Sequence, residues 1–262
     1  MNFHTFAVCA YKESPYLEEC IQSLLKQSDP SEIIVCTSTP NDYIKNTAEK
    51  YHLPLFCREG KSDIQDDWNF ACEKADSEYV TVAHQDDRYH PEYAKKLKKK
   101  LRQYPDTLIA MTDYRIINQN SQDRWEISLL IKQLLKLPLR SPLFAKQRWA
   151  KRAALAFGNS VCCPSVCYHK TRIHGKIFQS ELKYALDWDT YAALAEKKGR
   201  FTYLPSQLFY YRIHDGATSK ASLISHQKTE EEILMFGKFW PGWMVKLLIH
   251  FYKLSYGSYG KQ

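Results

Sequence analysis

The sequence has no run of about 20 consecutive apolar residues, which is the length that a membrane-spanning helix needs. Its first residues, MNFHTFAVCAYKES, enter a strand-like pattern directly, without the basic segment and apolar run of a signal peptide. Internal repeats and low-complexity linkers are also absent. At 262 residues and 44% hydrophobic content, the chain can form one domain, or one domain with an appendage. We therefore expect a folded protein that stays in the cytoplasm.

Cysteines paired at a two-residue gap, the usual spacing of zinc sites, are missing. Five of the eight cysteines fall singly within apolar stretches and are interpreted as small buried residues: Cys9, Cys20, Cys36, Cys57 and Cys72. A second group lies closer together but does not match a known zinc spacing: Cys162, Cys163, Cys167 and His169. The chain also lacks any recognised nucleic-acid-reading motif, so we expect no nucleic-acid partner.

Acidic residues are scarce in one segment. The net charge is +8, and the segment 124–152 contains a single acid, Glu126. Its basic residues are Arg124, Lys132, Lys136, Arg140, Lys146, Arg148, Lys151 and Arg152. A basic, leucine-rich segment indicates an anionic partner such as a lipid headgroup or a phosphate, and the alternative is a solvated helix face.

Strand and helix patterns alternate through the first 117 residues. Apolar runs predict strands over 3–10, 32–36, 55–57, 78–83 and 107–117, and periodic segments between them predict helices. Ser14 is the expected N-cap of the first helix. Such alternation implies parallel strands with right-handed crossovers and helices on both faces. We therefore expect an α/β fold whose loops converge at the carboxyl ends of the strands.

Paired carboxylates stand at the end of one of these strands. Residues 78–83 lead directly into His84, Gln85, Asp86 and Asp87. In an open α/β sheet ligands bind at this edge, and two adjacent acids repel each other unless a cation offsets their charge. A hard divalent metal that also binds a phosphorylated substrate fits this pattern. The alternative is a turn or helix cap ahead of Pro91.

Six blocks of the sequence, in order, resemble the successive motifs of a family 2 glycosyltransferase with the GT-A fold. They are AVCAYKESPYLEECIQSLLKQS, EIIVCTSTPND, GKSDIQDDWNFACEKADSEYVTVAHQDD, GNSVCCPSV, LDWDTYAALAEKKGRFTYLP and YYRIHDGATS. The resemblance implies a Rossmann-like, mostly parallel sheet in a domain over 1–220, with a nucleotide-sugar-binding half (1–117) and an acceptor and catalytic half (118–220). It also implies transfer of a sugar from a nucleotide-diphosphate donor, with inversion and a divalent metal, Mn²⁺ or Mg²⁺.

The resemblance assigns roles to individual residues. Asp86 and His214 are the expected metal ligands, although His214 could also be a simple turn residue. Asp187 matches the catalytic base, with Asp189 as the second choice and a helix cap as the structural alternative. The expected donor-binding residues are Ala10, Tyr11, Glu13, Thr37, Trp68, Asn69, Asp86 and Asp87.

Two positions depart from the family pattern. Thr37 and Ser38 stand where aspartates usually hold the nucleoside, and His84 stands where the metal motif usually has its first acid. The nucleotide contact must therefore differ, and a catalytically silent nucleotide-sugar-binding or scaffold protein is the alternative function. His84 either contacts ribose or phosphate or lines the wall of the cleft. Arg212 either contacts phosphate or packs on a neighbouring tyrosine.

The C-terminal extension, 221–262, contains one amphipathic segment. In Trp243–Leu254 the polar residues Lys246, His250 and Lys253 recur at helical spacing. A helix of about a dozen residues is too short to span a bilayer but can lie in its interface. We therefore expect a peripheral protein at the inner face of the cell membrane, acting on a lipid-linked surface glycan such as capsule or O-antigen. The alternative is a helix packed on the protein itself or in a homodimer.

Overall fold

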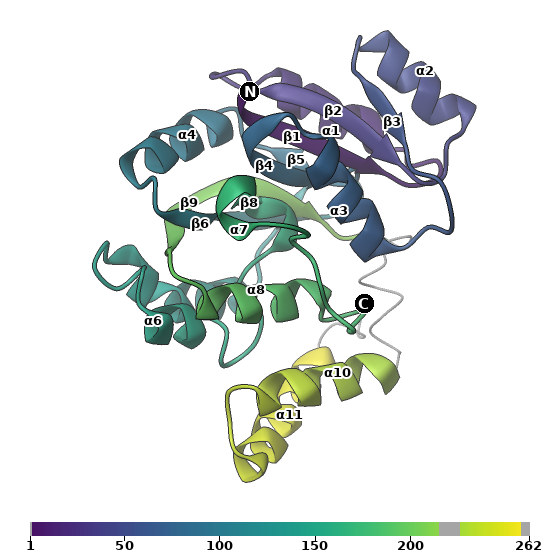
Figure 1. The fold of residues 1–262 in the computed structure, drawn as a ribbon. Coiled ribbons are helices and arrows are strands. Elements are labelled where there is room, and N and C mark those ends of the chain that lie inside the picture. Colours follow the sequence, from purple (N-terminus) through teal and green to yellow (C-terminus); the bar gives the residue numbers. More distant parts are fainter. Residues whose placement is uncertain (1, 215–225, 258–262) are drawn as a thin grey trace.

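The computed structural model describes residues 2–214 and 226–257, with side chains up to His250, and contains a nine-stranded mixed sheet (Figure 1). Eight strands follow in the order β3 (Leu55–Cys57), β2 (Glu32–Thr37), β1 (Asn2–Ala10), β4 (Ser77–His84), β8 (Val166–His169), β6 (Thr107–Ile117), β9 (Arg200–Arg212) and β5 (Arg88–Tyr89), and β7 (Asp123–Arg124) pairs with β6. The strands from β3 to β4 are parallel, as the alternation predicts. β8 runs antiparallel to both β4 and β6, whereas β6 and β9 are parallel.

Helices cover both faces of the sheet because the first strands are apolar on both sides. In β1, Phe6 and Val8 belong to one buried cluster, and Ala7 between them belongs to the other. The first cluster is covered by α1 (Leu17–Leu25), α2 (Asp42–Lys50), α4 (Tyr93–Gln103) and α5 (Ile127–Leu135). The second is covered by α3 (Ile64–Lys74), the 3₁₀ turn η1 (Leu137–Arg140), α6 (Arg148–Ala153), α7 (Lys170–Ile173) and α8 (Leu186–Glu196).

Local signals set two helix starts, but the predicted cap of α1 is wrong. Asn41 and Asp63 cap α2 and α3 by accepting hydrogen bonds from backbone N–H groups two or three residues ahead. Helix α1 begins only at Leu17, and Ser14 makes no cap to its first turn. Its hydroxyl donates to Asp86 Oδ1 over 2.7 Å and accepts from the N–H of Tyr16, ahead of the helix, over 3.3 Å.

Two further details of the fold differ from the sequence pattern. Strand β9 continues through Pro205, a residue that cannot donate a backbone hydrogen bond. The pairing of β9 with β6 passes from Leu204 directly to Gln207, so a bulge accommodates the residue that lacks an N–H. In α4, Lys98 does not share the solvent face of its neighbouring lysines: it is buried, and its Nζ lies 2.8 Å from Asp29 Oδ1.

The C-terminal extension packs on the domain. It consists of α10 (His226–Gly237), which the sequence pattern did not reveal, and α11 (Gly242–Gly257), beyond α8 in Figure 1. Phe236 of α10 meets the Trp188 ring of α8 edge to face, and Val245 and Ile249 of α11 are buried in the same cluster. Within the described ranges, no helix is both long enough and apolar enough to cross a bilayer. The interfacial role of α11 stays a prediction, although one of its faces covers the protein.

Candidate active site

The loops after β1, β2 and β4 converge at one edge of the sheet. The Gln85 side chain accepts a hydrogen bond from Tyr11 N and donates one to Tyr11 O, each over 2.9 Å. Lys12 has a positive φ of 52°, and its N–H donates to Thr39 Oγ1 over 2.7 Å. These bonds join the carboxyl ends of three parallel strands, where ligands of open α/β sheets bind.

Asp86 and His214 meet at this edge. His214 Nε2 lies 3.3 Å from Asp86 Oδ2, while Asp86 Oδ1 accepts the hydrogen bond from Ser14. The His214 ring packs against Tyr16, with 4.9 Å between ring centroids. His214 Nε2 is buried and has no hydrogen-bond partner among the described residues. A buried imidazole nitrogen without a partner, beside a carboxylate, is suited to a metal ion or a phosphate oxygen.

His84 faces the same region and is held by Trp68. The two rings stack with centroids 5.1 Å apart, and Trp68 also contacts Phe178 edge to face. Burial lowers the pKa of His84 to about 4, so its ring is neutral. His84 therefore forms part of a wall, while its Nε2 has no partner within the described part of the chain. The donor contact of Trp68 stays a prediction.

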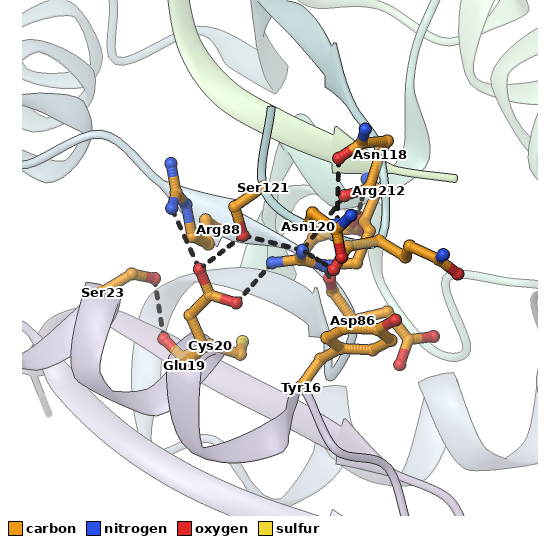
Figure 2. Close-up of polar contacts among 12 residues, drawn as sticks. Tyr16, Glu19, Cys20, Ser23, Asp86, Arg88, Asn118, Asn120, Ser121 and Arg212 are labelled. Carbon is orange, nitrogen blue, oxygen red and sulfur yellow. Dashed lines mark hydrogen bonds and ion pairs between the residues drawn. The ribbon is translucent and has the colours of Figure 1, made fainter. Parts of the chain in front are cut away.

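Arg212 is a buried residue that connects several segments. Its guanidinium donates to Glu19 Oε2 at 2.5 Å, to Ser121 Oγ at 2.9 Å and, through Nε, to Asp86 O at 2.8 Å (Figure 2). The group also lies over the Tyr16 ring, 4.4 Å from its centroid. With 2% of its surface exposed, Arg212 ties the end of β9 to α1 and to the backbone of Asp86.

Asp87 also anchors the end of β9. Its carboxylate is buried and accepts a hydrogen bond from Arg212 N over 2.8 Å. Burial raises the pKa of Asp87 well above its usual range. Asp87 thus holds the segment that carries His214, and its donor contact stays a prediction.

The remaining predicted donor residues differ in their surroundings. Tyr11 and Glu13 are exposed after β1, whereas Ala10 and Thr37 are buried at strand ends. Asn69 is also buried, and its amide pairs with the backbone of Phe178 through bonds of 2.8 and 3.0 Å. Tyr11 and Glu13 are therefore open to a ligand, while the side chain of Asn69 fixes the chain at Phe178.

Asp67 was not predicted as a site residue, yet it places a carboxylate at Ser38. Ser38 Oγ donates to Asp67 Oδ2 over 2.8 Å, and Arg58 Nε donates to Asp67 Oδ1 over 2.7 Å. Ser62 also lies within 3.1 Å of Oδ2. The carboxylate missing from the end of β2 is thus supplied by α3. Its position four residues after the N-cap Asp63 gave no sign of this in the sequence.

Asp187 lies in surroundings that shift the pKa of its carboxyl group. It lies in the first turn of α8, but the N-cap position is Ala185, so Asp187 is not the cap. Its Oδ2 accepts from Asn159 Nδ2 over 2.8 Å, and its Oδ1 accepts from Trp188 N over 2.8 Å. Burial raises the pKa of Asp187 to about 6, against the opposing effects of these bonds and of the Lys132 charge. Asn159 was missed as a site residue, although it lies in the GNSV block.

A family model described as "Glycosyl transferase family 2" matches residues 5–167, which is more than half of the chain. The chain belongs to glycosyl transferase family 2. The matched residues include Asp86 and Asn159 but end before Asp187 and His214. A search of curated proteins gave no match.

Two solved structures that are similar to this glycosyltransferase share its GT-A fold at low sequence identity. TarS residues 1–349 from S. aureus, in complex with UDP-GlcNAc, align with 94% of this chain and 70% of that one, at 17% identity and a TM-score of 0.63. The mannosyltransferase PcManGT from Pyrobaculum calidifontis, in complex with GDP-Man and Mn²⁺, aligns with 95% of this chain and 70% of that one, at 15% identity and a TM-score of 0.67.

Asp189 of the glycosyltransferase is occupied by structural contacts. Its Oδ2 accepts from Ser180 Oγ over 2.6 Å, and its Oδ1 pairs with Lys238, which follows α10. Both oxygens therefore hold neighbouring segments, whereas those of Asp187 are held by an amide and by its own helix.

The closely spaced cysteines of the glycosyltransferase do not form a zinc site in the described structure. No three His, Cys, Asp or Glu side chains there are grouped so that they could hold a metal by themselves. Burial raises the pKa of the Cys162 thiol, and the negative charges of Asp87 and Asp187 add to this shift. Cys162 therefore lies near both Asp87 and Asp187.

Proposed function

We propose that this glycosyltransferase moves a sugar from a nucleotide-diphosphate donor to an acceptor hydroxyl with inversion. The observation that carries the proposal is the partly buried Asp187 carboxylate, which accepts a hydrogen bond from Asn159 and whose pKa is raised to about 6 by desolvation. A general base works best when its pKa lies near the operating pH, so that it is ionised and still accepts a proton in the transition state. Asp187 would take the proton of the acceptor hydroxyl as that oxygen attacks the anomeric carbon.

The pair Asp86 and His214 fits a divalent metal. Magnesium-type ions are commonly held by one or two protein ligands, with substrate phosphates and water completing the shell. The partnerless Nε2 of His214 beside Asp86 Oδ2 provides such a partial set. When bound, Mn²⁺ or Mg²⁺ would act as a Lewis acid on the diphosphate leaving group. Ser14 and Arg212 fix Asp86 by its carboxylate and its backbone carbonyl, respectively.

The donor nucleoside is expected against the exposed Tyr11 and Glu13 and near the Ser38–Asp67 pair. In the family pattern, carboxylates at the end of the second strand hold the nucleoside. Here Asp67 supplies a carboxylate at the same place, which removes the main reason for the silent-scaffold alternative. The TarS and PcManGT complexes contain different nucleotides, UDP and GDP, so the fold accommodates both.

The acceptor we propose is a lipid-linked surface glycan, such as capsule, O-antigen or another exopolysaccharide, reached by a cytoplasmic protein held at the membrane. The support is the basic, apolar segment 124–152 and the exposed Trp243 and Leu247 of α11.

The proposed function is tested by thermal shift and hydrolysis with a panel of nucleotide sugars, with and without Mn²⁺. We expect one donor to stabilise the wild-type protein in Mn²⁺, and Asp86→Asn and His214→Gln to lose that metal-dependent effect. Asp87→Asn is a poor control because Asp87 holds the backbone of Arg212, so Asp66→Asn, at an exposed position, serves instead. Stabilisation of both variants equal to that of the wild type would refute the metal assignment.

A further inference from the structure

Helix α5 lies on the domain with its polar side inward. Lys136 is buried and its Nζ lies 2.7 Å from Asp113 Oδ1, while Lys132 Nζ donates to Tyr114 OH over 2.9 Å. Only Leu129 among its apolar residues is fully buried. The opposite side carries Ile127, Leu130, Ile131 and Leu134, which are 65, 47, 53 and 62% exposed. These four residues, at helical spacing, are here named the α5 face.

The α5 face continues into a larger exposed apolar region. Large exposed hydrophobic residues flank it on both sides: Trp125, Leu137, Leu143, Phe144 and Trp149. Half of the large exposed hydrophobics in the described structure thus fall within 125–149, about a tenth of the chain. A surface helix normally buries its apolar side, and apolar regions of this extent mark interaction sites. The α5 face therefore needs a partner.

The charge around the face decides between a lipid surface and a second copy of the chain. Lys136 and Lys151 are buried, and Arg148 and Arg152 share Glu196. Arg140 and Lys146 are exposed beside the apolar residues. Two copies joined through this face would oppose their basic residues, which costs free energy. An anionic bilayer offers acyl chains for the face and phosphate groups for the bases.

We propose that the α5 face inserts into the interface of an anionic lipid bilayer and holds the enzyme on the membrane. The inference deepens the proposed function, on which it rests for the nature of the acceptor. Lys132, on the inner side of the same helix, lies close enough to Asp187 for its charge to act on that carboxylate. The helix that meets the lipid thus carries a charge within range of Asp187, where the proposed function needs the acceptor hydroxyl of a lipid-linked substrate.

The test is co-sedimentation with phosphatidylcholine vesicles, plain or with about a third phosphatidylglycerol, at low and high salt. Ile131→Gln/Leu134→Gln should fold, because both side chains are exposed and Gln is a good helix former. We expect the wild type to bind the anionic vesicles and high salt to weaken that binding. The Ile131→Gln/Leu134→Gln variant should bind at least about tenfold more weakly than the wild type. Two variants serve as controls: Leu25→Gln/Ile64→Gln, with similarly exposed positions elsewhere, and Trp243→Ser/Leu247→Gln on α11.

Four results would overturn the inference. They are no binding of wild type, full binding of the α5 variant, loss of binding in the α11 variant alone, and a wild-type dimer in ultracentrifugation that the α5 variant converts to monomer. Donor-induced thermal stabilisation without vesicles should be the same in wild type and the α5 variant. If wild type binds vesicles but no nucleotide sugar, the proposed function fails and the lipid surface stands.

Discussion

The single residue Asp187 shows how burial can lower folding stability while it raises the basicity of a carboxylate. Its folded pKa of about 6 lies above the unfolded value of about 3.9, so the folded state binds more protons between these values. Folding stability contributed by this group is therefore highest below about pH 4 and falls as pH rises toward 6. At neutral pH the ionised carboxylate destabilises the fold, and the same property gives it the basicity that proton abstraction needs.

Asp187→Asn should therefore be more stable than wild type at pH 7.5, by on the order of 1–3 kcal/mol, and no more stable below about pH 4. Asn keeps an acceptor for the Asn159 amide but removes the charge. Urea denaturation at the two pH values measures the difference. A variant that is less stable than wild type at pH 7.5, or a difference independent of pH, would contradict the burial assigned to this carboxylate.

Asp67 carries the second prediction at this scale. Its carboxylate accepts hydrogen bonds from Ser38 Oγ over 2.8 Å and from Arg58 Nε over 2.7 Å. Asp67→Asn should weaken donor binding roughly tenfold or more, because a charge-assisted hydrogen bond contributes about 1.5–3 kcal/mol. Calorimetry with the donor found in the panel measures the affinity. Asp66→Asn, on the same helix turn but exposed, should bind like wild type, and equal affinity in both variants would remove Asp67 from the nucleoside site.

Helix α10 determines where α8 begins. The buried carboxylate of Glu231 accepts hydrogen bonds from the N–H groups of Lys183, Tyr184 and Ala185, at 2.7–3.1 Å. Ala185 is the N-cap of α8, two residues before Asp187. Helix α10, which holds no predicted site residue, therefore anchors α8, the helix that carries the proposed base Asp187.

Glu231→Gln should lower the rate of donor turnover about tenfold while leaving donor affinity within about twofold, because misplacing a base affects the transition state and not donor binding. The matched control is Glu230→Gln, on the same helix with an exposed side chain. Equal turnover in both variants would show that α8 is set by packing alone, and a parallel loss of affinity would indicate general unfolding.

The sequence predicted elements whose signals are local and missed those set by distant contacts. The two-sided apolar run of β1 and the periodic segments between strands were sufficient for β1, α2 and α3, and the structure adds the caps Asn41 and Asp63. Ser14 is not the cap because α1 begins only at Leu17, and its hydroxyl donates to Asp86, 72 residues further on. Helix α10 escaped notice because it buries Glu231 and Glu232, which break its apolar pattern.

The site followed the same division. Asp86, His214 and Asp187 were found through blocks that resemble a family, and the structure brings Asp86 and His214 together. Asp67 and Asn159 act through partners 29 and 28 residues away, which spacing does not reveal. Because Lys132 and Lys136 point inward, the exposed side of α5 is apolar, which is the reverse of a usual surface helix.

In the whole molecule, the parallel half places Asp86 at the edge of the sheet, and the second half carries Asp187, with Cys162 near enough to Asp87 and Asp187 for both charges to act on its thiol. The C-terminal helices pack with α8 in one buried cluster, whereas α5 covers the other cluster through Leu129 and turns its apolar face outward. In the proposed function, the first half would hold the donor at Asp86 and the second half would hold the acceptor hydroxyl at Asp187.

The most direct measurement is the rate at which wild type, Asp187→Asn and Asp86→Asn turn over one nucleotide-sugar donor, with donor binding in Mn²⁺ measured alongside. Wild type should release nucleotide from one donor, with a rate that falls below a pH of about 6 as Asp187 is protonated. Asp187→Asn should bind that donor like wild type and turn it over at least a hundredfold more slowly, a typical loss for a general base. Asp86→Asn should lose metal-dependent binding itself. Turnover by Asp187→Asn within tenfold of wild type, or binding by wild type that needs no metal and is unchanged in Asp86→Asn, would contradict a metal-dependent transferase with Asp187 as its base.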